Sequence, residues 1–485
     1  MGPAAQKETR MKNRICKLAL MIAAGIAHAQ ETPTERDAAR DVVRKMGELE
    51  KSLDLPKVVA GLDTANPPRE QVAARARELM QTELLALADD LTKHPEIGFE
   101  EFRSIDKLAA YLKQHGFEVT IGVGKLKTAF VAKYKNNRGA PTLGVIVEYD
   151  ALRGTKGPFH GDQHSAQGPV GMAAAVAIAE ALEKSKMPGS VVVIGTPAEE
   201  MMPPAKIDML EAGAFQGIDV LVRSHSSPAT TRPAAGFGSC CLNIDGVKYT
   251  FSGAPSHQMT PWAGRNALEG VIHLFNGVDA IRGNIRPEAR IQGIISEGGA
   301  APNVVPDRAV GDFYIRYPDE VYLAQIRDMV DNAAKAAALA TGTKVKIDNY
   351  GRDRDGFSLA SLAELGFAYL KRYGADQIKE EPDTPSGYDE TGLVSRAVPG
   401  IGFSAHTSNA TYHTYEMEAD ALTEVGHKGF VADAQAMAAL LYDFLTHPEY
   451  RALVKREFEG QKSLFDEYLE ALKKAYVKPS IPDPR

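Results

Sequence analysis

The chain of 485 residues is long enough for two or three domains around a large hydrophobic core. Its 44% hydrophobic and 25% charged residues are typical of a globular protein. A formal net charge of -7 argues against nucleic acid and against an anionic membrane as binding partners, and we expect neither.

The first 29 residues predict an export signal that precedes the folded protein. Met11 begins a basic segment, residues 18–26 form a short apolar run, and Ala27-His28-Ala29 is a small-residue cleavage site. The apolar run is too short to cross a membrane. We therefore expect cleavage after Ala29 and a periplasmic or secreted protein, with residues 1–10 as an upstream extension. The alternative is that this segment is an N-terminal helix of the folded protein.

From residue 31 the chain predicts an α/β domain. Residues 31–91 favour helices with a proline-rich break at 66–68. Strands then follow at residues 117–123, 128–135, 141–148, 190–195 and 220–223, and helices at 104–116, 169–185 and 207–213. Alternating strands and helices predict a mostly parallel sheet covered on both faces, with functional groups at the carboxyl ends of its strands. Five candidate residues follow strands in this arrangement: Asp150, His164, Glu199, Glu200 and His225.

Near Leu242 the pattern changes to that of a small α+β domain. Strands are predicted at residues 242–252, 290–298, 307–317 and 344–350, and helices at 264–282 and 318–342. The order β-α-β-β-α-β is typical of a ferredoxin-like sandwich. The sequence therefore predicts an inserted domain at 242–351 between two parts of a catalytic domain, 30–241 and 352–485. Helices around 359–373 and 426–445 continue the second part.

The adjacent carboxylates of Glu199 and Glu200 follow the buried strand at 190–195. Two such groups are costly to bury, and neighbours on one strand point to opposite faces. A metal ion resolves both problems if the chain turns there, because one carboxylate can bind the ion while the other acts as general base. A solvated pair of carboxylates at a strand end is the alternative that this motif alone leaves open.

Other potential ligands follow the same pattern. Asp162 and His164 stand two positions apart in a loop, where both can face one ion, and a carboxylate with an imidazole suits zinc or manganese. His225 ends another strand, and His413 lies far downstream. Taken singly, these residues fit a capping Asp or a structural His equally well. Their joint occurrence at strand ends favours a metal site.

Eight motifs between about residues 84 and 445 carry a resemblance to a known family. They are His94-Pro-Glu-Ile-Gly-Phe-Glu-Glu101, Tyr149-Asp-Ala-Leu152, Gly195-Thr-Pro-Ala-Glu-Glu200, Ser224-His225, Gly253-Ala-Pro-Ser-His257, Pro261-Trp-Ala-Gly-Arg-Asn-Ala267, Pro302-Asn-Val-Val-Pro306 and His413-Thr414. In this order they resemble the co-catalytic zinc-peptidase family of aminoacylases and carboxypeptidase G. The most similar branch contains aminobenzoyl-glutamate hydrolase and the auxin-conjugate amidohydrolases. The resemblance implies a catalytic domain with a mixed, mostly parallel sheet and an inserted ferredoxin-like dimerisation domain.

The resemblance also implies a ligand set for two divalent metal ions, zinc first and manganese second. Asp162 matches the position that bridges both ions. His164 and Glu200 match ligands of one ion, and His225 and His413 match those of the other.

Further roles follow from the same resemblance. Glu199 matches the general base, and Asp150 matches a carboxylate that orients a ligand. His257 matches a histidine that reaches into the partner subunit's site to stabilise the oxyanion, which implies a homodimer. Asn303 and Arg316 match positions that hold the substrate, often through its carboxylate.

The expected function is that of an exported, dinuclear metal amidohydrolase that cleaves N-acyl or N-aroyl amino acids or related small amides. One alternative is a metallo-carboxypeptidase or dipeptidase for short peptides, and another is a catalytically silent binding subunit. Two departures from the branch bear on this choice. Asp162 and Gln163 stand where a cysteine and a glycine are usual, and Met201-Met-Pro-Pro204 replaces glycines after the Glu pair. The prolines stiffen this loop and the methionines make it apolar, which predicts a pocket that accepts bulky apolar or aromatic groups.

Overall fold

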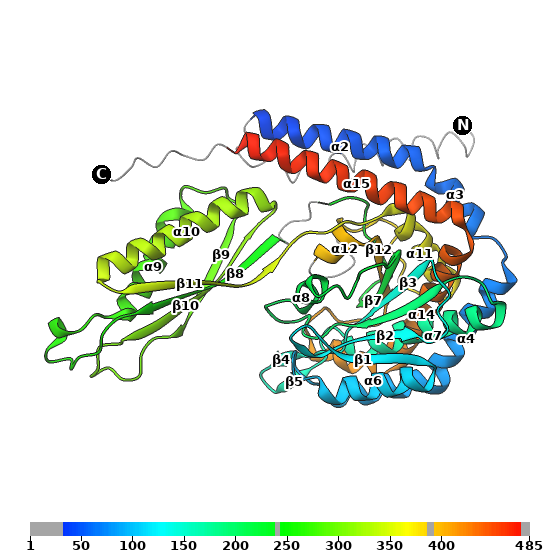
Figure 1. Ribbon diagram of the computed structural model, residues 1–485, viewed down its shortest axis with the longest axis horizontal. Coiled ribbons are helices and arrows are strands. Elements are labelled where there is room, and N and C mark those ends of the chain that lie inside the picture. Colours follow the sequence, from blue (N-terminus) through cyan, green and yellow to red (C-terminus); the bar gives the residue numbers. More distant parts are fainter. Residues whose placement is uncertain (1–32, 238–242, 386–391, 477–485) are drawn as a thin grey trace. The chain divides into compact units, whose positions relative to one another are not determined.

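The computed structural model describes residues 33–237, 243–385 and 392–476 and divides them into two compact units (Figure 1). The larger unit comprises residues 50–246 and 350–462, and the smaller unit comprises residues 247–349 together with the chain before residue 50 and after residue 462. The predicted export signal lies outside the described residues.

The larger unit is built on a six-stranded sheet, and the predicted mostly parallel α/β architecture is confirmed. The strand order is β1-β2-β6-β3-β7-β12. Strands β6, β3, β7 and β12 are parallel, whereas the hairpin of β1 and β2 adds antiparallel strands at one edge. The bounds are β1 Phe117–Val123, β2 Leu126–Tyr134, β3 Thr142–Val147, β6 Ser190–Gly195, β7 Val220–Ser227 and β12 Gly400–His406.

Apolar side chains of the central strands enter two cores, one on each face of the sheet. In β3, Val145 and Val147 pack in the core formed with α4, α6, α7, α11 and α14, whereas Ile146 packs in the core formed with α8 and α12. This alternation follows from the two-residue period of a strand, and it explains why the central strands are apolar throughout. The helices are α4 Pro67–Leu79, α6 Phe102–Gln114, α7 His164–Ser185, α8 Ala205–Glu211, α11 Ala360–Arg372, α12 Leu393–Ala397 and α14 Glu424–Thr446.

Several helix boundaries have local causes. The proline-rich break starts α4, because the Asn66 side chain accepts a hydrogen bond from the backbone N–H of Arg69 and prolines fill the first helical positions. Helix α7 begins at His164, five residues before the predicted start, and includes Pro169. The remaining elements of this unit are α3 Leu55–Leu62, the π-helical turn Met80–Leu84, α5 Leu85–Thr92, the short strands β4 Leu152–Gly154 and β5 Gly157–Phe159, and α13 Tyr415–Ala421.

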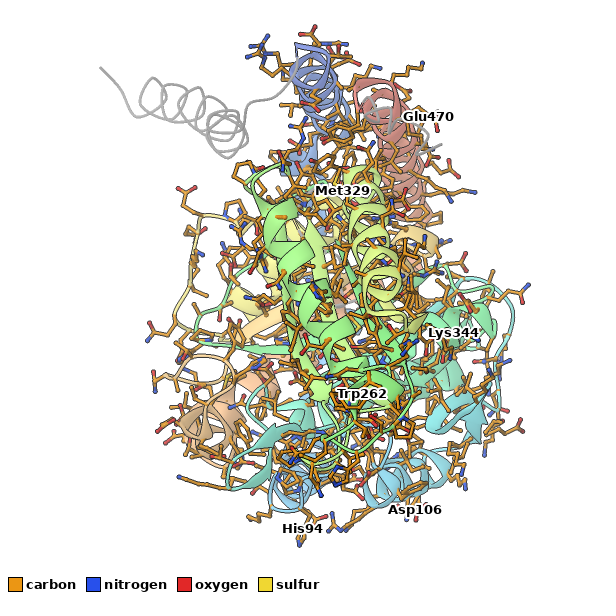
Figure 2. All side chains as sticks on the ribbon, turned by 90° about the vertical axis from the view of Figure 1, so that its left-hand side faces the viewer. His94, Asp106, Trp262, Met329, Lys344 and Glu470 are labelled. Atoms are coloured by element: carbon orange, nitrogen blue, oxygen red, sulfur yellow. The ribbon has the colours of Figure 1, made fainter. Side chains whose placement is uncertain are left out.

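The smaller unit contains the predicted β-α-β-β-α-β sandwich. Its four-stranded sheet has the order β11-β8-β10-β9, with β8 Asn243–Ser252, β9 Arg290–Glu297, β10 Arg308–Tyr317 and β11 Lys344–Asp353. Helices α9 Ala267–Arg282 and α10 Glu320–Thr341 pack with it around Phe251, Leu274 and Phe313. Trp262, the single tryptophan, is 77% exposed in the short helical turn Pro261–Ala263 that precedes α9 (Figure 2).

Both terminal helices contribute to the smaller unit, which the sequence did not predict. Lys45 of α2 (Pro33–Leu53) forms an ion pair of 2.5 Å with Glu467 of α15 (Pro448–Ala475). Arg286 pairs with Glu35 and lies over the rings of Tyr322 and Tyr476, at 5.1 and 5.0 Å from their centres. None of the helices in the described part of the chain has the length and apolarity that a membrane span requires.

Candidate metal centre

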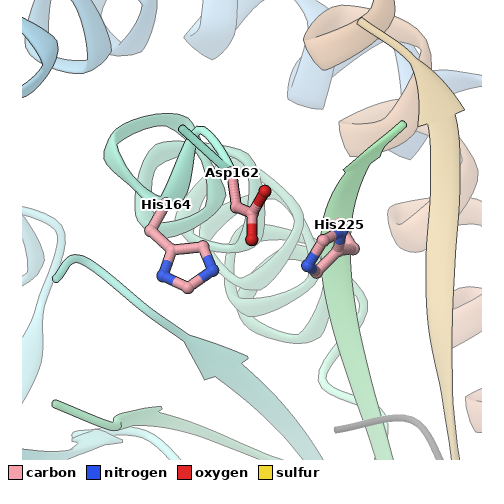
Figure 3. Close-up of side chains that lie close together, drawn as sticks. All are labelled: Asp162, His164 and His225. Carbon is pink, nitrogen blue, oxygen red and sulfur yellow. The ribbon is translucent and has the colours of Figure 1, made fainter. Parts of the chain in front are cut away.

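Potential metal ligands meet where the parallel strands of the larger unit end. Among the described residues, three groups of ligand atoms lie within 4.8 Å of one another: Asp162 with His164 and His225, Asp162 with Glu200 and His413, and His164 with Glu199 and Glu200. In the first group the Asp162 carboxylate lies between the two imidazole rings (Figure 3). The structure thus brings together all five residues for which the sequence implied metal binding.

Asp162, His164 and Glu200 each belong to two of these groups, and the implied bridging role of Asp162 is compatible with this arrangement. One oxygen of Asp162, Oδ2, lies 2.9 Å from Nε2 of His413, and the same nitrogen lies 4.0 Å from Oε2 of Glu200. Nε2 of His164 lies 3.9 Å from Oε1 of Glu200. The groups thus include the implied pairing of His164 with Glu200, and they also place His225 beside His164 and Glu200 beside His413. Which ligand serves which ion stays a prediction.

The ligands come from elements that meet at the carboxyl ends of the parallel strands. His164 is the first residue of α7, and His225 lies inside β7, because the strand continues four residues beyond its predicted end. His413 stands in the loop between β12 and α13 with a left-handed backbone, φ +60°. Its backbone N–H donates to the carbonyl of Gly161 at 3.1 Å and to Asp162 Oδ1 at 3.2 Å. The loop of His413 is thereby fixed to the loop of Asp162.

Gln163 explains how the chain accommodates a departure from the resembled motif. It has φ +56°, a conformation in which glycine has no steric cost. Its buried side chain donates a hydrogen bond of 2.5 Å to the carbonyl of Met417 in α13. The glutamine thus links the Asp162 loop to the helix that follows His413, a contact that glycine could not make.

Asp150 holds two parts of the ligand group. Its Oδ1 lies 3.0 Å from Nδ1 of His164, and its Oδ2 accepts a hydrogen bond of 3.0 Å from the backbone N–H of Glu200. With Nδ1 engaged, Nε2 of His164 is directed to the ligand group. Burial disfavours the charged imidazolium, but the bond to Asp150 and the nearby carboxylates of Glu200 and Glu148 raise the pKa of His164 to about 10.

The site gathers more negative charge than its own side chains neutralise. Burial, together with Asp162 and Asp150, raises the pKa of Glu200 to about 8 in spite of the nearby His164. Oε1 of Glu199 is buried without a hydrogen-bond partner among the described residues. Carboxylates crowded in this way, together with imidazoles, are the donor set of zinc or manganese, and divalent cations would neutralise them. The residues therefore fit a dinuclear metal group.

His225 has the properties of a neutral ligand. Its Nδ1 lies 2.8 Å from the carbonyl of Ser226, which leaves Nε2 available. Burial, aided by the nearby Arg223, lowers the pKa of His225 to about 4, and the neutral imidazole is the form that binds metal. The ring of Tyr412 lies 5.9 Å from that of His225, and its hydroxyl donates to Ser227 Oγ at 3.1 Å. Sequence reasoning did not select Tyr412, although it precedes His413.

A buried charge cluster beside the ligands was also missed. Glu148 forms ion pairs with Lys206 at 2.6 Å and with Arg223 at 3.0 Å, and its Oε2 lies 3.9 Å from Nε2 of His164. Burial raises the pKa of Glu148, but Arg223 and Lys206 hold it well below its usual range. Glu148 is therefore ionised and already neutralised by protein cations. The sequence signal was the strand end Glu148-Tyr-Asp150, but nothing indicated that Lys206 is buried.

His257, Asn303 and Arg316 belong to the smaller unit and form no part of these ligand groups. The structure brings two of them together, because His257 pairs with Val304 in an antiparallel bridge and the N–H of Gln258 donates to the carbonyl of Asn303 at 3.1 Å. Arg316 lies in β10 opposite Arg290 of β9. Their relation to the metal ligands stays a prediction.

Comparisons with known proteins identify relatives of this sequence and of this fold. The sequence pattern of the M20 peptidase dimerisation domain matches residues 242–341. Xaa-Arg dipeptidase of Homo sapiens is 32% identical over 395 residues, covering 77% of this chain and 88% of that protein. One of the subunits of p-aminobenzoyl-glutamate hydrolase from Escherichia coli is 33% identical over 276 residues, 54% of this chain and 56% of that one. The solved structure of a dinuclear metal-binding M20 peptidase from Bacillus subtilis shares the fold, with a TM-score of 0.50 and 18% identity over 75% of this chain and 99% of that one.

Proposed function

We propose that this protein cleaves N-acyl or N-aroyl amino acids. The chain belongs to the M20 family of metal-dependent peptidases and amidohydrolases, and it is therefore a hydrolase of amide bonds. Two divalent ions, zinc or manganese, would be held by Asp162, His164, Glu200, His225 and His413. The observation that carries the proposal is the unpaired, buried Oε1 of Glu199 beside this ligand group.

Amide hydrolysis needs a nucleophilic water, a polarised carbonyl and a protonated leaving amine. When bound, the two metal ions would act as Lewis acids and lower the pKa of the attacking water. The oxygen of the attacking water bonds to the carbonyl carbon, and Glu199 accepts a proton from this water. The C–N bond then breaks, and Glu199 delivers that proton to the departing nitrogen. Asp150 keeps the imidazole of His164 in one orientation throughout.

Substitution of the base tests this assignment. Glu199→Gln keeps the size of the side chain but cannot accept the proton, so the variant should retain bound metal and lose nearly all turnover. Metal content and kcat would be measured on the same preparation, with Glu118→Gln as a matched control at an exposed position of β1. Turnover retained by Glu199→Gln would refute its role as the base.

A dipeptidase is the second candidate, and the similarity to Xaa-Arg dipeptidase favours it. A substrate panel separates the two, because it compares aroyl-glutamates and N-acyl aromatic amino acids with dipeptides, each assayed with zinc and with manganese. The loop Met201-Met-Pro-Pro204 supports preference for bulky apolar acyl groups, and preference for small polar acyl groups would contradict that part of the proposal.

We also propose a homodimer in which His257 acts on the partner's substrate, as a donor to the tetrahedral oxyanion, while Asn303 and Arg316 hold the substrate carboxylate. The match of residues 242–341 to a dimerisation domain supports this arrangement. Inactive His257→Ala chains mixed with inactive Glu199→Gln chains should recover activity. No recovery after demonstrated subunit exchange would indicate that each site is completed by one chain.

Export is proposed from the N-terminal sequence alone. Residues 1–29 would be removed, and the mature protein would begin at Gln30 in the periplasm or outside the cell. N-terminal sequencing of protein from the native host tests this, and an intact N-terminus on the active protein would refute it.

A further inference from the structure

The motif His94-Pro-Glu-Ile-Gly-Phe-Glu-Glu101 contributes no metal ligand, yet its second half contacts the turn that carries Glu199. The segment is anchored on both sides. Ile97 forms a parallel bridge with Ala151, and the N–H of Ala151 donates to the carbonyl of Glu96 at 2.8 Å. The carboxylate of Glu96 accepts the backbone N–H groups of Arg103 and Ser104 at 3.0 and 2.7 Å, which fixes the start of α6. Glu96 therefore has a structural explanation within its own segment.

The Glu101 carboxylate interacts with its own backbone and with Thr128, and it also reaches the turn of Glu199. Its side chain is fully buried, and Oε1 accepts a hydrogen bond of 2.8 Å from the backbone N–H of Ala198. Burial raises the pKa of Glu101 to about 7. The amide N–H of Ala198 needs an oxygen acceptor at this position, which a glutamine side chain also supplies.

The bonded amide belongs to an unusual turn. Ala198 has φ +53°, a left-handed conformation that non-glycine residues rarely adopt. On the far side of Glu199, the N–H of Glu200 donates to Asp150 at 3.0 Å. The backbone amides before and after Glu199 are thus both fixed by buried carboxylates. These two contacts hold the backbone on both sides of Glu199.

Gly98 completes the support of the turn. A Cβ atom at this position would lie 2.7 Å from Cβ of Ala198 and 2.8 Å from Sδ of Met201. Distances below 3.0 Å require one of the two segments to move. Residue 98 is therefore confined to glycine by the close approach of the turn.

We propose that residues 96–101 form a cradle for the Glu199 turn and that Glu101 is a positioning residue for the general base. The inference rests on the proposed role of Glu199 and assigns a task to a motif that metal binding leaves unexplained. Glu101 acts through the backbone of Ala198 and touches neither substrate nor metal ligand.

Two substitutions at Glu101 separate hydrogen bonding from packing. Glu101→Gln keeps an acceptor for the N–H of Ala198, whereas Glu101→Met fills a similar volume without one. Glu101→Gln should have a kcat close to that of the unmodified protein. Glu101→Met should keep its metal content and KM while kcat falls by about 100-fold, the usual scale for a misplaced catalytic group.

Comparison of an amide with the ester of the same acyl group adds a readout that a merely structural role would not change. An amine must be protonated to leave, whereas an alkoxide of an ester needs less help, so a misdirected Glu199 should impair amide hydrolysis more than ester hydrolysis. Gly98→Ala retains Glu101 and should also impair amide hydrolysis more than ester hydrolysis. It replaces Glu101→Met in this comparison if that variant fails to fold. Gly61→Ala is the matched control for Gly98→Ala, because a Cβ there meets nothing within 4 Å.

Three results would overturn the inference: full kcat in Glu101→Met, equal losses in Glu101→Gln and Glu101→Met, or loss of metal in parallel with kcat. Failure of the proposed function would be distinguishable, because Glu199→Gln would then keep its turnover whatever the Glu101 variants do.

Discussion

Asp150→Asn should weaken metal binding without removing a ligand. Asp150 accepts one hydrogen bond from Nδ1–H of His164 and one from the N–H of Glu200, both at 3.0 Å. Asparagine has one side-chain oxygen, so its amide group must face one of these two donors. The variant thus loses one hydrogen bond to a charged group, which is worth about 1.5–3 kcal/mol. At about 1.4 kcal/mol per factor of ten, this is about a 10- to 100-fold loss of metal affinity.

The assay is competition for zinc between the metal-free protein and a chromogenic chelator at constant pH. Asp90→Asn is a matched control, since Asp90 is also an aspartate held by hydrogen bonds, but to Arg103 rather than to a ligand. Thermal unfolding of the metal-free proteins checks that both variants are folded. An unchanged zinc Kd in Asp150→Asn would refute the argument that Asp150 orients His164.

Three further predictions concern stability. In the metal-free protein the pKa of His164 is raised to about 10, so the stabilising contribution of this residue is complete below about pH 6.5 and is lost as the pH rises through 10. The Tm of chelator-treated protein should therefore fall over this pH range. A Tm that does not change with pH would contradict this prediction. Burial raises the pKa of Asp433 to about 7, so Asp433→Asn should stabilise the protein by a few kcal/mol above pH 7 and have little effect near pH 4. Urea unfolding at both pH values measures this difference, and equal effects of the substitution at the two pH values would disprove the prediction. Arg69→Met leaves Asp443 buried without its ion-pair partner at 3.0 Å, and should lower the free energy of unfolding by about 3–5 kcal/mol; a loss below about 1 kcal/mol would show that the pair is dispensable.

Much of the fold was predictable because its signals are local. Apolar β-branched runs such as residues 190–195 identified the central strands, and the change of pattern near Leu242 identified the inserted sandwich. The parallel arrangement then placed the carboxyl ends of the strands, and with them His225 and Glu199, at one end of the sheet. Helix α15, which the sequence analysis did not select, is largely polar and has no strong local start beyond Pro448.

The missed parts of the site depend on contacts between distant segments. Glu148 meets Lys206 across 58 positions of sequence, and a lysine in a short helix gives no sign of burial. Glu101 meets Ala198 across 97 positions, and its partner is a backbone amide that no side-chain pattern reveals. His225 was placed after its strand because the polar run Arg223-Ser-His-Ser226 lacks the apolar residues that mark a strand interior.

The carboxylate of Asp162, which belongs to two of the three ligand groups, has a consequence for redox chemistry. A cysteine at this position would be a thiolate ligand, open to oxidation to a sulfenic acid and to mixed disulfides. A carboxylate undergoes neither reaction, and the described residues contain no cysteine. Peroxide and thiol-modifying reagents therefore have no thiolate to attack among these ligands.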